Sequence, residues 1–210
     1  FPEISMFESE PWGGFGANPL PDYLRKMWEQ AGSMQAGGFP YSEGLFEDLN
    51  KAIMAAFYWN GGGDPDEAIR EYANVYFSSR AKTPALEAVQ LLETTNRRER
   101  WQDGQPQWMP ETAEVPGDEQ FVIAHPEGVD RALSLVEAID RGLAPRQKHS
   151  WRWRIVYLRA VIDHELAHNG FRANERVEAA FEELIRIYHA EDALWAVRPP
   201  CRRGRVIGWD

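Results

Sequence analysis

The chain has 210 residues, enough for one sizeable domain with a hydrophobic core, and it carries a net charge of -10. That charge argues against a general nucleic-acid binder, which needs clustered basic residues, and here the tightest basic group is Arg202, Arg203 and Arg205. Cys201 is the only cysteine, which excludes an intrachain disulfide and a cysteine metal cluster, and no run approaches the ~20 apolar residues of a membrane span.

The first forty residues predict a short strand, a loop and a helix. Residues 1–6 resemble a buried strand, and because the chain begins at Phe1 rather than methionine, we interpret its start as a boundary inside a longer protein. Residues 11–21 contain three glycines and three prolines, which predicts a loop. Pro21 suits a helix start, and Tyr23, Leu24, Met27 and Trp28 follow helical spacing within a predicted helix over 22–35.

Helical periodicity then continues through most of the chain. Start and stop signals predict further helices at about 45–59, 65–77, 84–100, from 126 onward, 151–168 and 174–194. Asp64 is the expected N-cap of the second of these, with Pro65 at its first position, and Ser150 is the expected cap of 151–168. Residues 101–120 predict an exposed loop, and 121–124 a short strand or extended connection.

Six or seven helices with almost no strand predict a mainly α fold. Helix-on-helix packing in a bundle-like domain is the expected architecture. The core face of the helix that begins at Pro126 is expected to contain Val129, Leu133, Val136 and Ile139.

Two glycine-rich loops combine carboxylates with aromatic side chains. Carboxylates paired across a cleft are what glycoside hydrolysis requires, and an aromatic ring offers a flat face to a sugar. The candidate residues are Glu8, Glu10, Trp12 and Phe15 in the first loop and Tyr41, Glu43 and Phe46 in the second. The alternative is that Trp12 and Tyr41 are core residues and that the acids are solvated.

Three stretches carry a resemblance to a protein family. They are Phe-Pro-Glu-Ile-Ser-Met at 1–6, Pro-Trp-Gly-Gly-Phe-Gly-Ala-Asn-Pro-Leu-Pro at 11–21 and Gly-Gly-Phe-Pro-Tyr-Ser-Glu-Gly-Leu-Phe-Glu-Asp-Leu-Asn-Lys at 37–51. Together they resemble the end of the barrel in large, poorly characterised bacterial (β/α)₈-barrel proteins related to glycoside hydrolases. The segments 151–160 and 188–200 also look similar to that family.

The resemblance implies a domain division and a role. Residues 1–38 would be the last strand, loop and helix of a barrel, 39–198 a helical C-terminal domain that buttresses it, and 199–210 a tail. Barrel chemistry lies in the loops after the strands, so Glu8, Glu10 and Glu43 are the catalytic candidates and the four loop aromatics would bind the sugar. The expected partners are a carbohydrate and the missing N-terminal barrel, without nucleic acid, membrane or cofactor, in a secreted or periplasmic protein; this fragment alone would be inactive.

A rival motif lies in the predicted helix 151–168. His164-Glu165-Leu166-Ala167-His168 matches H-E-x-x-H, in which two histidines one turn apart hold zinc and the glutamate activates water. The extended signature fails at Phe171 and Asn174. The third-ligand candidates considered downstream, none at a distinctive spacing, are Glu178, Glu182, Glu183, His189 and Glu191.

Two simpler interpretations stay open. His164 and His168 would be ordinary residues near a helix C-terminus, where a cationic side chain is mildly favoured. Arg152, Arg154 and Arg159, next to Trp151 and Trp153, are expected to lie over apolar neighbours with their charges in water. A purely structural helical domain, a further alternative, predicts no pocket that combines carboxylates with aromatics.

Overall fold

The computed structural model describes residues 17–38, 47–95, 101–102, 105–106, 126–169 and 174–187. Within these ranges the α-helices are α1 (Pro21–Ala31), α2 (Asp48–Asn60), α3 (Pro65–Tyr76), α4 (Lys82–Thr95), α5 (Val129–Gly142), α6 (Pro145–Lys148), α7 (Trp151–His168) and α8 (Glu175–Ile187). Three short 3-10 turns accompany them: η1 (Gly32–Met34), η2 (Ser79–Ala81) and η3 (Pro126–Gly128). The predicted mainly α class is confirmed.

Extended structure in the described ranges is confined to a short hairpin. β1 (Trp101–Gln102) pairs antiparallel with β2 (Gln105–Pro106). This hairpin lies within the segment 101–120 that was predicted as a loop. None of the described helices is both long and apolar enough to cross a bilayer.

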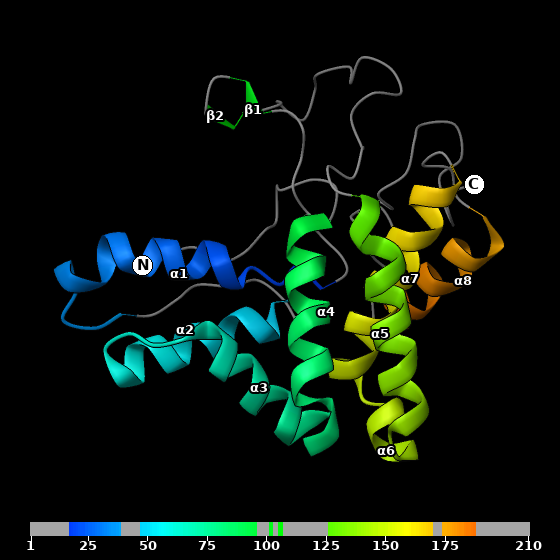
Figure 1. Ribbon diagram of the computed structural model, residues 1–210, viewed down its shortest axis with the longest axis horizontal. Helices are drawn as coiled ribbons and strands as arrows, with labels where there is room; N and C mark the ends of the chain where they lie inside the picture. The colour runs from blue at the N-terminus through cyan, green and yellow to red at the C-terminus, as the bar shows by residue number, and fades with distance from the viewer. Residues whose placement is uncertain are drawn as a thin grey trace.

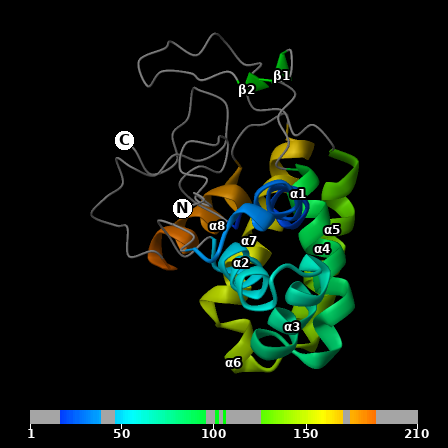
Figure 2. The same ribbon diagram turned by 90° about the vertical axis from the view of Figure 1, so that its left-hand side faces the viewer.

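The helices form two layers that meet at α4. α4 and α5 lie side by side, α7 packs behind α5, and α8 covers the far side of α7 (Figure 1). α1 and α2 lie one above the other and project sideways from α4, as the turned view also shows (Figure 2). α3 connects this pair to the foot of α4.

α7 is the central helix of the described structure. Its buried residues lie on most of its sides, as expected for a helix surrounded by others. Trp153 is fully buried, packs edge-on against Phe77 with ring centroids 5.0 Å apart, and donates through Nε1 to Asp140 Oδ1 at 2.9 Å. The indole thus fills the core and also satisfies its one polar group.

Local sequence signals explain most helix ends. Asp64 caps α3 by accepting from the backbone nitrogen of Asp66 at 2.9 Å, as predicted. α2 ends at Gly61, whose φ of +69° lies in the left-handed region that favours glycine. Ser150 is at the predicted N-cap of α7, but its side chain makes no capping hydrogen bond. The short α6 was not predicted.

Two predictions about side chains have opposite outcomes. The predicted core face of α5 is confirmed, since Val129, Leu133, Val136 and Ile139 are all buried. The prediction for Arg159 is wrong: its side chain is fully buried and ion-paired, whereas its charge was expected to lie in water. The reason is that the side of α7 that carries Arg159 is covered by other parts of the fold, which a single-sequence pattern does not reveal.

Candidate functional site

All seven loop candidates for a sugar cleft lie outside the described residues. They are Glu8, Glu10, Trp12, Phe15, Tyr41, Glu43 and Phe46. The described chain resumes just after each loop, at Ala17 after the first and at Glu47 after the second. The structure therefore describes the contacts of the residues that directly follow each loop.

Asn50 joins the two points directly. Its Nδ2 donates to the carbonyl oxygen of Asn18 at 2.7 Å, and its Oδ1 accepts from the backbone nitrogen of Leu20 at 2.9 Å. Both asparagines are fully buried. Because a buried backbone group without a partner is costly, this amide stabilises the extended segment 17–20 against the first turn of α2.

Arg159 holds the same segment from α7. Its Nη1 donates to the carbonyl oxygen of Ala17 at 2.5 Å and to Asn18 Oδ1 at 3.0 Å, and its Nε donates to Asp163 Oδ2 at 2.9 Å. Thr95 Oγ1 donates to the same Asp163 oxygen at 2.7 Å. Burial lowers the pKa of Arg159, and the charge of Asp163 opposes that shift.

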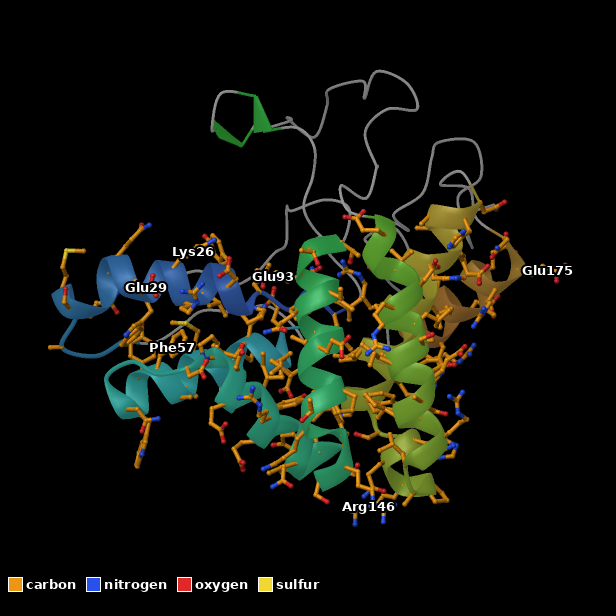
Figure 3. The ribbon with its side chains drawn as sticks, in the orientation of Figure 1. Lys26, Glu29, Phe57, Glu93, Arg146 and Glu175 are labelled. Carbon is orange, nitrogen blue, oxygen red and sulfur yellow. The ribbon has the colours of Figure 1, made fainter. Side chains whose placement is uncertain are left out.

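Glu93 of α4 completes this set by capping α1. Its two carboxylate oxygens accept from the backbone nitrogens of Asp22 at 3.0 Å and Tyr23 at 2.9 Å, and its side chain lies where α1 meets α4 (Figure 3). No side chain at Leu20, the N-cap position, supplies a cap. A carboxylate is favourable here because the helix N-terminus carries partial positive charge. We call Asn50, Glu93, Arg159 and Asp163 the buried tether.

A second group of polar side chains lies at the C-terminal end of α7. His164 and His168 are one turn apart, and Asp130 reaches them from the first turn of α5. Asp130 Oδ1 lies 3.2 Å from His164 Nε2 and 2.7 Å from His168 Nε2. The three ligand atoms lie within 4.8 Å of one another. Two imidazoles and a carboxylate converging in this way match the donor set of a transition-metal site.

The third potential ligand is Asp130, which lies upstream in α5, whereas the sequence motif directs the search for a third ligand downstream. Of the downstream candidates, Glu183 pairs instead with Arg154, at 2.5 and 2.7 Å, and Glu182 lies near Arg186. The spacing rule for H-E-x-x-H proteins looks only downstream. Asp130 becomes a neighbour because α5 packs antiparallel to α7, and no linear pattern carries that information.

Glu165 has a different environment from a metal-activating base. Its Oε1 accepts from Arg176 Nη1 and its Oε2 from Asn174 Nδ2, both at 2.8 Å. Burial raises the pKa of Glu165, but Asn174, Arg176 and His164 together lower it below its usual range. A general base works best with a pKa near neutrality, so these contacts weaken the role predicted for Glu165.

The electrostatics of the cluster follow from its hydrogen bonds. The hydrogen bond from His168 lowers the pKa of Asp130, and this effect outweighs that of burial, which raises it. Asp130 therefore keeps its negative charge, which is the form that binds a cation.

Comparison with known protein families, with curated proteins and with solved structures finds no match to this chain.

Proposed function

We propose that the chain is the helical C-terminal region of a glycoside-hydrolase-like protein, and that its body holds loops 7–16 and 39–46 so that both contribute to one carbohydrate cleft. The observation that supports this most directly is the contact of Asn50 with Asn18 and Leu20. It places the residues that follow the two loops within hydrogen-bonding distance of each other.

The buried tether favours a rigid connection between the segment that follows the first loop and the helical body. Buried ion pairs and amides add little net stability compared with apolar packing, so their use here calls for a reason. Two separate helices, α2 and α7, direct buried polar side chains at one short segment, Ala17–Leu20, and Glu93 of α4 bonds the first turn of α1 that follows it. A binding loop needs a fixed base, because each rotatable segment that must be ordered on binding weakens affinity.

The role of the helical body as a buttress rests on the packing of α1. In this proposal residues 1–6 are the last barrel strand and α1 is the last barrel helix. Leu24 of α1 is fully buried in the same apolar cluster as α2, α4 and α7. Such a shared core would transmit the position of the barrel end to the helical domain without a flexible linker.

Within the cleft, Glu8, Glu10 and Glu43 supply the candidate carboxylates, and Trp12, Phe15, Tyr41 and Phe46 the apolar faces for sugar rings. Hydrolysis needs two carboxylates on opposite sides of the glycosidic bond. The remaining barrel strands would supply at least one of them, so the chain by itself is expected to contribute binding without turnover.

A distance measurement tests the shared cleft. With Cys201→Ser as background, spin labels are placed at Trp12→Cys and Glu43→Cys. Catalytic carboxylates lie about 5 to 9.5 Å apart across a sugar, so labels lining one cleft should give a narrow distribution below about 20 Å. A broad or much longer distribution overturns the proposal. A label at Trp59, exposed at the end of α2, paired with Trp12 provides the reference for unrelated sites.

Sugar binding provides a second, independent readout. Oligosaccharides of different linkage are titrated against the chain and followed by NMR chemical shifts. Trp12→Ala and Glu43→Gln should weaken any binding that is seen. Trp59→Ala, which removes an equally large aromatic from an exposed place, should leave it unchanged. Equal losses for Trp12 and Trp59 would indicate nonspecific stacking.

A zinc peptidase stays the second candidate because Asp130 lies close enough to both histidines to serve as the third ligand that the motif lacked. The observation against it is that both carboxylate oxygens of Glu165 accept hydrogen bonds, one from Arg176 of α8 and one from Asn174 just before it. Zinc-loaded chain is incubated with an unfolded protein substrate, beside Glu165→Gln. Cleavage that is lost in the variant would favour the peptidase.

A further inference from the structure

We propose that Asp130, His164 and His168 bind one divalent transition-metal ion, which fastens the first turn of α5 to the last turn of α7. This site is independent of the carbohydrate cleft and does not use Glu165 as a base. Glu165 instead acts as a positioning residue that orients His164.

The geometry is close to that of a bound ion. Ligand atoms about 2.0 Å from a tetrahedral metal lie about 3.3 Å from one another. In the described structure Asp130 Oδ1 is 3.2 Å from His164 Nε2 and 2.7 Å from His168 Nε2. For an ion to enter, Asp130 and His168 must separate by about 0.6 Å, and the ligand atoms already lie within 4.8 Å of one another. Both side chains are more than half exposed, at 66% and 56%, so that movement meets little packing.

The donor set selects the kind of ion. Imidazole nitrogen suits zinc, nickel, cobalt and copper, whereas calcium and magnesium prefer oxygen ligands throughout. The two histidines lie on one helix at the i, i+4 spacing, with ring centroids 4.5 Å apart. The site opens to solvent at His168, so water can complete the coordination.

The other nitrogen of His164 gives a second, independent observation. Its Nδ1 is buried and makes no hydrogen bond within the described part of the chain. The nearest carboxylate oxygen is Glu165 Oε1, at 3.4 Å. A histidine that binds metal through Nε2 carries its proton on Nδ1 and commonly donates it to a carboxylate. Metal binding would therefore turn this unsatisfied buried atom into a donor that faces an acceptor.

Glu165 is itself held in place for that role. Arg176 and Asn174 each bind one of its oxygens at 2.8 Å, and Asn174 also caps α8 by accepting from the backbone nitrogen of Val177 at 2.9 Å. The carboxylate that faces His164 is therefore anchored to a third helix. This arrangement explains why the H-E-x-x-H glutamate is present without serving as a base.

Zinc binding by the full chain is the direct test. The protein is treated with chelator, dialysed and titrated with zinc alone, and bound metal is counted by elemental analysis. We expect about one zinc per chain, and cobalt in its place should give the visible absorption of a low-symmetry site. Asp130→Ala, His164→Ala and His168→Ala should each abolish stoichiometric binding. His149→Ala removes an exposed histidine from the far end of α6 and should change nothing.

Asp130→Asn separates a metal site from a simple hydrogen-bonded contact. Asparagine keeps an oxygen that can accept from His168 but loses the charge that a cation needs. The folded variant, checked by circular dichroism, should lose zinc. Binding that persists in Asp130→Asn, or in all three alanine variants, overturns the proposal. So does an absence of zinc binding by the original chain, or an equal loss in His149→Ala.

The positioning role of Glu165 has its own readout. Removing a carboxylate that hydrogen-bonds a metal-binding histidine commonly weakens metal affinity about 10- to 100-fold. Glu165→Gln should show a loss in that range and a shifted cobalt spectrum, with one ion still bound at saturation. Glu175→Gln, at the exposed start of α8 (Figure 3), is the matched control and should keep the original affinity. An unchanged affinity in Glu165→Gln would remove this role from Glu165.

Discussion

Asn50 Nδ2 donates to the carbonyl oxygen of Asn18 over 2.7 Å, although the two residues are 32 positions apart in the sequence. The contact joins the start of α2 to the segment that leads into α1. It is buried, so water cannot replace either partner. The residues that follow the two candidate sugar loops are therefore joined by a buried contact. Substitution of Asn50 tests how much this contact stabilises the protein.

Asn50→Ala should destabilise the protein strongly for its size. It removes the acceptor of the buried Leu20 nitrogen and a donor to the buried Asn18 oxygen, at about 1–3 kcal/mol for each lost contact. Urea denaturation should show a loss of about 2–6 kcal/mol by this reasoning. Asn60→Ala, at the exposed end of the same helix, should stay within about 0.5 kcal/mol. Similar values for both variants would contradict the tether.

Arg159→Met should cost more than removal of a surface charge. It leaves Asp163 buried without its counter-charge, which typically costs about 3–5 kcal/mol. The double variant Arg159→Met/Asp163→Leu should recover much of that loss, because the buried charge is then gone. Arg70→Met, which breaks an exposed pair with Glu67, should cost about 1 kcal/mol or less. The measurement is the free energy of unfolding, by heat or urea, of the original protein, the two single variants and the double variant.

Glu93→Ala should loosen α1 without unfolding the other helices. The carboxylate caps the backbone nitrogens of Asp22 and Tyr23, and loss of a cap costs about 0.5–2 kcal/mol. Amide hydrogen exchange should speed up at those two residues and little elsewhere. Glu87→Ala, which removes a partly exposed carboxylate of the same α4 that pairs with Arg131 of α5, should leave exchange in α1 unchanged. Uniform acceleration across the protein would argue against a local cap.

Tyr72→Phe should flatten the loss of stability at alkaline pH. Burial, and then the hydrogen bond to Asp48 at 2.6 Å, raise the pKa of Tyr72 above its ordinary value of 10.0. Above pH 10 the unfolded chain releases the phenolic proton while the folded chain keeps it, so stability falls as pH rises. The phenylalanine variant lacks this proton.

The measurement is urea denaturation of both proteins between pH 8 and 11, comparing slopes rather than absolute values. Tyr72→Phe also loses its hydrogen bond, so it starts lower but should decline less steeply. Tyr23→Phe, which removes a half-exposed phenol, is the control and should keep the original slope. Parallel slopes for all three proteins would show that Tyr72 ionises normally.

Helix positions and the apolar faces could be predicted from the sequence. The Asp64 cap and the buried face of α5 depend on residues within a few positions of one another, and local periodicity reports them directly. The small α6 was missed because its four residues carry no periodic pattern. The sugar-cleft residues lie outside the described ranges, so their predicted role stays a prediction.

The sequence by itself determined the helices, and also the pair of histidines one turn apart in α7. The tertiary structure alone decided that Asp130 faces those histidines, that Arg159 is buried and that Asn50 holds Asn18. The physical reason is the range of the interactions. Helical periodicity and capping act over one or two turns, whereas each of these contacts depends on how separate helices pack around α7.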